Sequence, residues 1–173
     1  MQIEVSSYAK INSFLNVLGK RADGYHEIYT HFQLLDLKDA LFFSTSSQNQ
    51  AFCDGITPEE NIILKSIKWF NNKFGKSQHF SVTVEKNIPM GAGLGGGSSN
   101  AAATLCFLCD FHGIVRRLLD FHEISFELGA DIPIFIFGKS AFASGIGEKI
   151  EEESNDKSSY ILIIPDIHIS TKL

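Results

Sequence analysis

The residues of this sequence that most plainly indicate chemistry form a glycine-rich segment at positions 89–99, which reads PMGAGLGGGSS. Five of its residues are glycines, and backbone without side chains can approach a ligand closely with its N–H groups turned toward it. A strand is expected before the segment and a helix after it, and a helix N-terminus favours phosphate. The alternative is a flexible connection in which Ser99 caps the helix. The residues expected to bind the phosphates are Pro89, Met90, Gly91, Ala92, Gly93, Leu94, Gly95, Gly96, Gly97, Ser98 and Ser99.

Three familiar phosphate-binding motifs can be compared with this segment. Residues 91–96 satisfy the G-x-G-x-x-G spacing of dinucleotide-binding folds, but two helices are expected to follow where that fold needs a second parallel strand. A P-loop is excluded because no Gly-Lys-Ser or Gly-Lys-Thr ends the segment. A protein kinase is excluded because neither H-R-D nor D-F-G follows. The segment therefore indicates a third kind of nucleotide-dependent kinase.

A second group of polar residues lies near the N-terminus. If residues 8–12 are extended, alternate side chains share a face, which places Tyr8, Lys10 and Asn12 together. Residues 21–26 read RADGYH and form a turn by composition, because Asp-Gly tolerates a positive φ. The sequence thus predicts a polar face on a strand, followed by a turn that carries two aromatic rings.

The three cysteines raise the question of a metal site. Cys106 and Cys109 have the C-x-x-C spacing of zinc sites, but no second cysteine pair exists and the surrounding residues are apolar. Residues three apart on a helix share one face, so we expect two buried, reduced thiols. No metal ligand is predicted in this chain.

Composition limits the remaining possibilities. The chain has 173 residues, of which 44% are hydrophobic and 20% charged, so one packed domain is expected and disorder is excluded. The net charge is −5, and the only adjacent basic pairs are at residues 20–21 and 116–117, which argues against binding to nucleic acid or to membranes. A soluble, cytoplasmic protein with a small-molecule partner is expected, while its oligomeric state is not predicted.

Mixed strands and helices must position these residues, which indicates an α/β or α+β sandwich with one layer of helices. A capping-box spacing at residues 57–60 is expected to start the first helix. The acidic residues 148–156 are expected to form a solvated turn. Strands are predicted at residues 3–7, 10–18, 39–44, 50–53, 79–85, 132–137, 141–144 and 160–164, and helices at 61–74, from the glycine-rich segment to about 110, and at 116–128.

Residues 89–102 resemble the second motif of the GHMP small-molecule kinases. Three further parts of the chain narrow the resemblance to the 4-diphosphocytidyl-2-C-methyl-D-erythritol kinases: AKIN at residues 9–12, RADGYH at 21–26, and LGADIP at 128–133 followed by GIGE at 145–148. The matching segments cover essentially the whole chain. The resemblance implies the fold of the GHMP kinase N-terminal domain, an α/β (α+β two-layer) mixed sheet covered by helices, with the β-α-β topology of ribosomal-protein domain 2.

The resemblance also implies the roles of individual residues. Lys10 and Asp131 would be the catalytic pair, with Asp131 as the base that takes the proton of the substrate hydroxyl. Tyr25 and His26 would recognise the cytidine, and Asn12 would help to hold the erythritol and phosphate portion. Considered without the resemblance, Lys10 is a solvent-facing lysine, Asp131 a turn former and His26 a polar turn residue.

By the same resemblance, residues 89–99 would bind the triphosphate of ATP, and Mg²⁺ would arrive with the nucleotide. The implied reaction is ATP-dependent phosphorylation of the 2-hydroxyl of 4-diphosphocytidyl-2-C-methyl-D-erythritol, a step of the non-mevalonate isoprenoid route. Residues 1–165 are expected to form the ATP-binding domain, and residues 166–173 the start of a crossover to a C-terminal domain that this chain lacks. Two alternatives stay open, an inactive nucleotide-binding fragment and a different GHMP small-molecule kinase.

Overall fold

A computed structural model of the protein describes residues 2–153 and 158–164. Its longest elements are two antiparallel strands, β1 (Ile3–Lys20) and β2 (His26–Ser46), joined by a short turn. Shifts of register interrupt β1 between Tyr8 and Lys10 and at two later points, but the strand continues through them. The two separate stretches predicted before residue 18 are therefore one strand. The stretch predicted at residues 39–44 is the end of a far longer one.

Four shorter strands complete a mixed sheet among the described residues. β4 (His79–Glu85) and β5 (Ala141–Gly145) pair antiparallel with the two ends of β2, on the side away from β1. β3 (Gln50–Phe52) runs parallel to β4, and β6 (Lys149–Glu152) runs antiparallel to β5. Because β2 contacts β1, β4 and β5, it is the central strand of the sheet.

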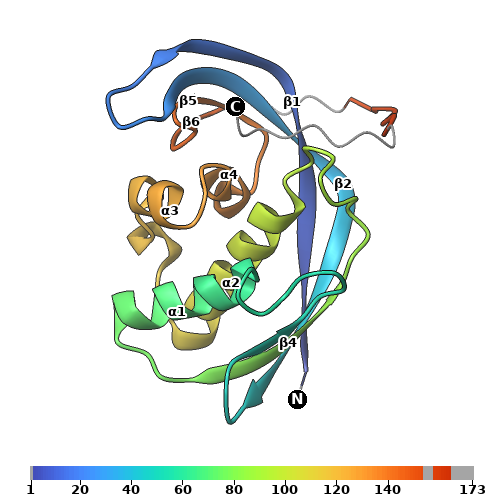
Figure 1. Cartoon of the computed structure of the whole chain (residues 1–173), viewed down its shortest axis with the longest axis vertical. Helices are drawn as coiled ribbons and strands as arrows, with labels where there is room; N and C mark the ends of the chain where they lie inside the picture. Colours follow the sequence, from blue (N-terminus) through green and yellow to red (C-terminus); the bar gives the residue numbers. More distant parts are fainter. Residues whose placement is uncertain (1, 154–157, 165–173) are drawn as a thin grey trace.

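The helices gather on one face of the curved sheet (Figure 1). They are α1 (Ile62–Phe74), α2 (Gly96–His112), α3 (Phe121–Glu127) and α4 (Ile132–Phe137), with a short 3₁₀ turn at Arg116–Leu118. A mixed sheet with one layer of helices is the fold class expected from the sequence, which is thereby confirmed.

The core lies between the sheet and helices α1 and α2. Leu41 and Phe43 of β2 are fully buried there, and the ring of Phe43 stacks on Phe107 of α2 at a centroid distance of 4.0 Å. Ile67 and Phe70 on α1 fill the same layer. The core therefore fixes α2 against the sheet, and α2 begins at the glycine-rich segment.

The start of α1 is set by an asparagine. The side chain of Asn61 accepts a hydrogen bond from the backbone N–H of Ile63 at 3.0 Å, as an N-cap does. The predicted cap at Thr57 is therefore wrong, because the cap is Asn61, four residues later, and the helix begins at Ile62. The helix ends at Phe74 as predicted, and the residue after it, Gly75, is left-handed.

Residues 132–137 form helix α4 and not the predicted strand. Six consecutive apolar residues fit a buried strand and a buried helix equally well. The deciding feature is Pro133, which stands in the first turn, where a missing N–H costs nothing. The predicted helix at 116–128 is likewise interrupted, since Asp120 caps a new helix by accepting the N–H groups of His122 and Glu123.

The end of the described chain differs twice from expectation. Residues 160–164 form no strand, and Ile161 is 94% exposed, because the chain there pairs with no edge among the described residues. Part of the predicted acidic turn is instead strand β6, whose residues pair with β5. Residues 154–157 of that turn and the predicted crossover at 166–173 lie outside the described residues.

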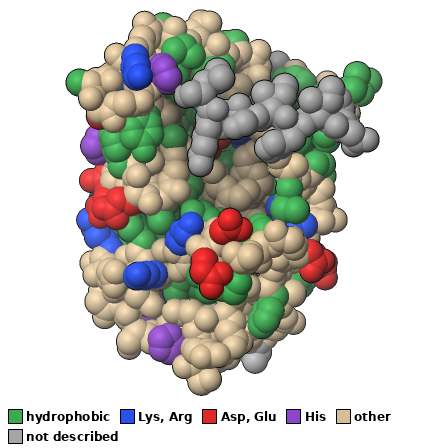
Figure 2. Space-filling view, in the orientation of Figure 1, with side chains coloured by type: hydrophobic (Ala, Val, Ile, Leu, Met, Phe, Trp, Pro, Cys, Tyr) green, Lys and Arg blue, Asp and Glu red, His purple; other side chains and the backbone are tan. Residues whose placement is uncertain are grey.

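Acidic and basic side chains are interspersed over the face shown in Figure 2. Within the described residues, no helix is both long enough and apolar enough to cross a membrane.

Candidate active site

The glycine-rich segment is a loop between β4 and α2 that bends sharply at alternate residues. Gly91, Gly93 and Gly95 all have φ near +73°, which is the left-handed region that other residues avoid. The side chain of Leu94 between them is buried against Ala9 and Ile88, so it anchors the loop to the sheet. At Gly95 a Cβ atom would lie 2.7 Å from the ring of Phe135. The loop can follow this path only with glycine at that position.

Helix α2 starts directly from the loop and offers its N-terminus to a ligand. Its N-cap is Gly95, and no side chain among the described residues caps it. The N–H of Ser99 bonds to the carbonyl of Gly95 at 2.8 Å, which leaves the N–H groups of residues 96–98 outside the regular helical bonding. Such a terminus carries a partial positive charge and binds anions.

The two serines at the start of α2 face different surroundings. Ser99 is buried, and its hydroxyl oxygen accepts a hydrogen bond from Ser7 of β1 at 2.8 Å. Ser98 is less buried and lies near Gly129, in the segment that leads to Asp131. Of the two predicted ligand residues, Ser98 is therefore the one that faces the rest of the predicted site.

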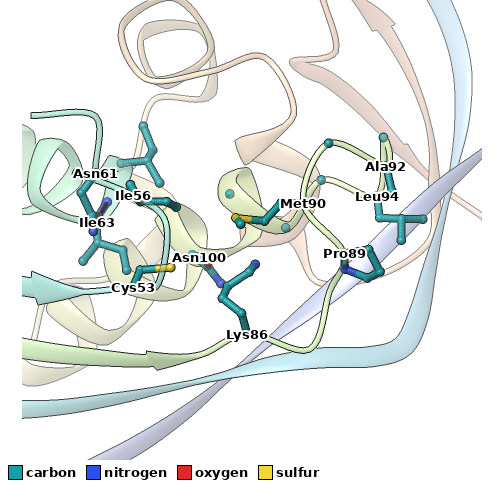
Figure 3. Close-up of a pocket in the computed structure, with 16 residues that line it drawn as sticks. Cys53, Ile56, Asn61, Ile63, Lys86, Pro89, Met90, Ala92, Leu94 and Asn100 are labelled. Atoms are coloured by element: carbon teal, nitrogen blue, oxygen red, sulfur yellow. Dashed lines mark hydrogen bonds between the residues drawn. The ribbon is translucent and has the colours of Figure 1, made fainter. Parts of the chain in front are cut away.

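A pocket of about 180 Å³ adjoins the loop. Figure 3 shows Lys86 and Met90 between the loop and the start of α1. Asn61 contributes a polar group, because its buried Nδ2 has no hydrogen-bond partner in the described part of the chain. The sequence analysis missed this part of the site, which is lined by Cys53, Ile56, Asn61, Ile62, Ile63, Lys86 and Asn100 as well as by the loop.

Lys10 connects the sheet, the loop and the aspartate. Its backbone N–H donates to the carbonyl of Leu94 at 3.0 Å, and its Nζ lies 3.3 Å from Oδ2 of Asp131. The lysine is 5% exposed, so it is not a solvent-facing residue. The structure thus brings together Lys10 and Asp131, which are 121 positions apart in the sequence.

Asn12 completes this cluster from the same strand. Its Oδ1 accepts a hydrogen bond from Nζ of Lys10 at 2.7 Å, and its Nδ2 donates to Oγ1 of Thr30 at 2.7 Å. Thr30, fully buried on β2, in turn donates to the carbonyl of Phe14. These bonds orient the amide of Asn12 so that its oxygen faces the lysine. Tyr8, predicted on the same face, is separated by the shift of register and contacts Lys38 instead.

Asp131 stands just before α4, on a segment supported by the turn at residues 145–148. In that turn Gly147 has φ +122°, and a Cβ there would lie 3.1 Å from the carbonyl oxygen of Ala130. The carboxylate of Glu148 accepts the N–H of Ile146 at 2.7 Å and closes the turn. The GIGE segment therefore packs against the residue before Asp131. Asp131 itself is partly exposed.

Tyr25 and His26 lie farther along, at the turn between β1 and β2. Arg21 shapes this turn by bonding to Asp23 at 3.0 Å and to Glu27 at 2.9 Å. The ring of Tyr25 meets Phe126 of α3 edge to face at 4.9 Å, and His26 is exposed. Tyr25 lies beside the helix that precedes Asp131. Among the described residues, neither Tyr25 nor His26 forms a hydrogen bond, ion pair or ring contact with the cluster around Lys10.

The C-x-x-C pair lies inside helix α2. Cys106 and Cys109 are both buried and both free thiols, as predicted. Burial raises the pKa of both thiols, and the pKa of Cys109 reaches about 11. No group of three or more His, Cys, Asp or Glu side chains in the described residues is placed to hold a metal ion.

A family comparison accounts for the arrangement of loop, helix and aspartate. Residues 61–139, from the cap of α1 to just beyond α4, match the family described as the GHMP kinases N terminal domain. Residues 61–139 therefore resemble a GHMP kinase N-terminal domain. The match includes the loop, α2 and Asp131, while Lys10 and Asn12 lie before it on β1 of the same sheet.

Similar proteins extend the comparison over nearly the whole of this chain. A 4-diphosphocytidyl-2-C-methyl-D-erythritol kinase of Francisella tularensis subsp. novicida (strain U112) is 46% identical over 172 residues. The alignment covers 96% of this chain and 62% of that relative. The kinase of the same name from Acinetobacter baylyi (strain ATCC 33305 / BD413 / ADP1) is 44% identical, with 99% and 63% covered. The chain therefore spans less than two thirds of the length of these relatives.

Solved structures agree with this assignment. A crystal structure of 4-(cytidine 5'-diphospho)-2C-methyl-D-erythritol kinase matches with a TM-score of 0.72 at 34% identity, covering 88% of this chain and 55% of that one. The mevalonate kinase of Methanococcus jannaschii matches with a TM-score of 0.57 at 16% identity, covering 90% and 56%, and so shares the fold alone. The resemblance stated from the motifs is confirmed, and it falls within the small-molecule kinases of the GHMP family.

Proposed function

We propose that this GHMP domain uses ATP to phosphorylate the 2-hydroxyl of 4-diphosphocytidyl-2-C-methyl-D-erythritol. The observation that carries the proposal is the position of Lys10, which bonds to the loop through its backbone and to Asp131 through its side chain. An ammonium group and a carboxylate next to a phosphate-binding loop are what phosphoryl transfer to an alcohol requires. The names of the relatives support this choice of substrate.

In the proposed reaction the substrate hydroxyl attacks the terminal phosphorus of ATP. A bond forms between the hydroxyl oxygen and phosphorus, the bond to the bridging oxygen breaks, and ADP leaves with the electron pair. Asp131 accepts the hydroxyl proton, and the ammonium of Lys10 offsets the charge on the transferred group. The N–H groups at the start of α2 bind the phosphate oxygens that stay behind.

The geometry of the pocket supports a place for the nucleotide base, and the remaining roles in this proposal are those that the family resemblance implies. The apolar wall formed by Ile56, Ile63 and Met90, with the amide of Asn61, is suited to a nucleotide base. Tyr25 would stack on the cytosine and His26 would bond to its edge, while Asn12 would hold the erythritol portion. Mg²⁺ would arrive with ATP and neutralise its phosphate oxygens, and no protein ligand is assigned to it. Residues 1–165 as the ATP-binding domain, and a location in the cytoplasm, remain predictions.

The proposal is tested by measuring turnover with both substrates and, separately, the shift in melting temperature caused by ADP. Asp131→Asn is expected to lower kcat by about 10²–10⁴-fold, because it removes the base. Lys10→Ala is expected to lower kcat by about 10²–10³-fold, because it removes a charge at the transferred group. Asp110→Asn and Lys139→Ala are matched controls, since both side chains are exposed and pair only with neighbours.

Both active-site variants should keep the melting temperature of the unmodified chain within a few degrees. Turnover near the normal rate in Asp131→Asn would overturn the assignment of the base. A rise in melting temperature with ADP, but no turnover in the unmodified protein, would favour a nucleotide-binding module without activity. Turnover with homoserine or mevalonate in place of the cytidine substrate would favour a different GHMP kinase.

A further inference from the structure

Asp39, a residue for which the motifs suggest no role, lies behind the glycine-rich loop. It belongs to β2 and is completely buried. Its Oδ1 accepts the backbone N–H groups of Asn87 and Ile88, each at 2.8 Å. These two residues lead directly into the loop at Pro89. One carboxylate oxygen therefore fixes the point at which the chain leaves β4 and enters the loop.

The other carboxylate oxygen holds the opposite end of the loop. Oδ2 accepts a hydrogen bond from Nδ2 of Asn100 at 3.0 Å, and the same amide nitrogen donates to Ser7 at 2.9 Å. Asn100 lies on α2, directly after the serines at its start. Asp39 thus ties both ends of the loop to the central strand of the sheet.

Oδ2 of Asp39 also forms an ion pair with Nζ of Lys86. The ammonium of Lys86 stands at the start of α2, because a Cβ placed on Gly96 would lie 3.0 Å from this nitrogen. Lys86 lines the pocket beside the loop (Figure 3). A lysine ammonium has three donors, so pairing with Asp39 leaves donors for an anion in the pocket.

The charge state of Asp39 agrees with this arrangement. Burial alone would raise the pKa of its carboxyl group, but the hydrogen bonds from Ile88, Lys86, Asn100 and Asn87 outweigh burial and lower the pKa. Asp39 is therefore a carboxylate at neutral pH. A buried carboxylate held by several donors is costly to disturb, which makes it suitable as a fixed point.

We propose that Asp39 is a positioning residue for nucleotide binding, which holds the ammonium of Lys86 at the start of α2 and fixes both ends of the phosphate-binding loop. This inference rests on the proposed function, since the anion in the pocket would be the phosphate chain of ATP or ADP. Asp39 would not touch the nucleotide. It would act through Lys86 and through the backbone of the loop.

The two oxygens of Asp39 make Asp39→Asn an informative substitution. The Oδ1 of asparagine can still accept from Asn87 and Ile88, but its NH₂ group would face the donors of Lys86 and Asn100. We expect the Kd for ADP to rise about 10-fold, or by about 1.4 kcal/mol, as measured by calorimetry. Asp36→Asn is the matched control, because Asp36 is exposed on the same strand, and it should leave the Kd unchanged.

Lys86 supplies the variants that separate positioning from folding. Lys86→Met should weaken ADP binding by about the same factor, and adding Asp39→Asn to it should weaken binding little further, because the two residues act as one unit. Lys86→Arg should restore most of the affinity, since a guanidinium keeps the ion pair. The inference is wrong if the Kd of the double variant rises by the product of the two single-variant factors. It is also wrong if Asp39→Asn binds ADP with the Kd of the unmodified chain.

Hydrogen exchange of the backbone separates failure of this inference from failure of the proposed function. If the unmodified chain binds no ADP, the proposed nucleotide site is wrong. In that case Asp39→Asn must still speed the exchange of amides 95–100, at the α2 end of the loop where the bond to Asn100 is lost, and unchanged exchange there overturns the inference. If Asp39→Asn fails to fold, the comparison of Lys86→Met with Lys86→Arg decides, because a binding loss that arginine does not restore also overturns it.

Discussion

The glycine-rich loop and the turn between β1 and β2 both carry residues assigned to ligands, but the protein holds them differently. The loop is fixed by buried groups on three sides: Leu94 packs into the sheet, Lys10 bonds to its backbone, and Asp39 ties both of its ends. The turn is shaped by the partly exposed ion pairs of Arg21 and by one ring contact of Tyr25.

The apolar side chains that flank the turn are exposed as well. Leu15, Val17 and Leu18 on β1 are all more than half exposed. The difference matches what each region is proposed to do. Transfer of a phosphoryl group depends on fixed geometry, which the buried contacts of the loop supply before any ligand arrives. Recognition of a flat base needs exposed rings, which a ligand can cover when it binds.

The largest expected difference between the two regions concerns their glycines. Gly95→Ala should lower the free energy of unfolding by about 2–4 kcal/mol, because it combines a strained left-handed φ with a clash against Phe135. Gly24→Ala in the turn has a similar φ but open space around it, so a loss of about 1–2 kcal/mol is expected. Urea denaturation measures both losses, and equal losses would show that packing around the loop adds nothing.

The second expected effect concerns substrate affinity at the turn. Tyr25→Ala should raise the KM for the cytidine substrate about 10-fold, since base stacking on an aromatic ring contributes about 1–3 kcal/mol. The kcat and the KM for ATP should change little, because the loop is anchored independently of the turn. Steady-state kinetics with each substrate varied measures this, with Tyr8→Ala, another exposed tyrosine, as control. A fall in kcat without a change in KM would contradict the assignment of Tyr25 to the substrate.

Local sequence patterns were sufficient to predict the elements that form the loop region. Strand β4 has the bounds that its alternation predicts, and α1 starts within one residue of the expected position. Both elements have regular apolar periodicity and clear stops. The pattern fails for residues 132–137, where a short apolar run has no periodicity that separates helix from strand.

The contacts within the site were beyond local patterns. Asp39 looks like the first residue of a strand, and its partners lie 47 to 61 positions away. The predicted pairing of Lys10 with Asp131 came from the family resemblance and not from spacing. Only the fold shows that β1 is continuous through its bulges and that Thr30 orients Asn12. Site geometry depends on long-range packing, whereas single elements depend on neighbours in the sequence.

The third prediction uses pH to compare buried and exposed ionisable groups of the two regions. Burial raises the pKa of Cys109, on the helix behind the loop, from 9.0 to about 11. The folded chain keeps this proton while the unfolded chain releases it above pH 9, so stability present below pH 9 is lost as the pH rises toward 11. The urea midpoint should therefore fall more steeply between pH 8 and 10.5 in the unmodified chain than in Cys109→Ala. Over this pH range the unmodified chain should lose about 1 kcal/mol more free energy of unfolding than Cys109→Ala does.

Asp23 in the turn is the control for this measurement. Burial acts to raise the pKa of its carboxyl group, but hydrogen bonds from Tyr25 and Arg21 lower it. Any effect of this group on how the free energy of unfolding varies with pH is therefore confined to acid pH. Asp23→Asn should therefore leave the fall of the urea midpoint between pH 8 and 10.5 unchanged. If the urea midpoint falls equally steeply with pH in Cys109→Ala and in the unmodified chain, the thiol of Cys109 is no better shielded from solvent than the groups of the turn.

The smallest effect is expected for Leu18→Ser, at the exposed end of β1. Leu18 is 65% exposed, so its replacement should change the free energy of unfolding by less than about 0.5 kcal/mol in urea denaturation. The same change should raise solubility, because it removes apolar surface next to Val17. A loss of more than about 1 kcal/mol would show that this end of β1 is packed in solution. The contrast between an anchored loop and an open turn would then no longer hold.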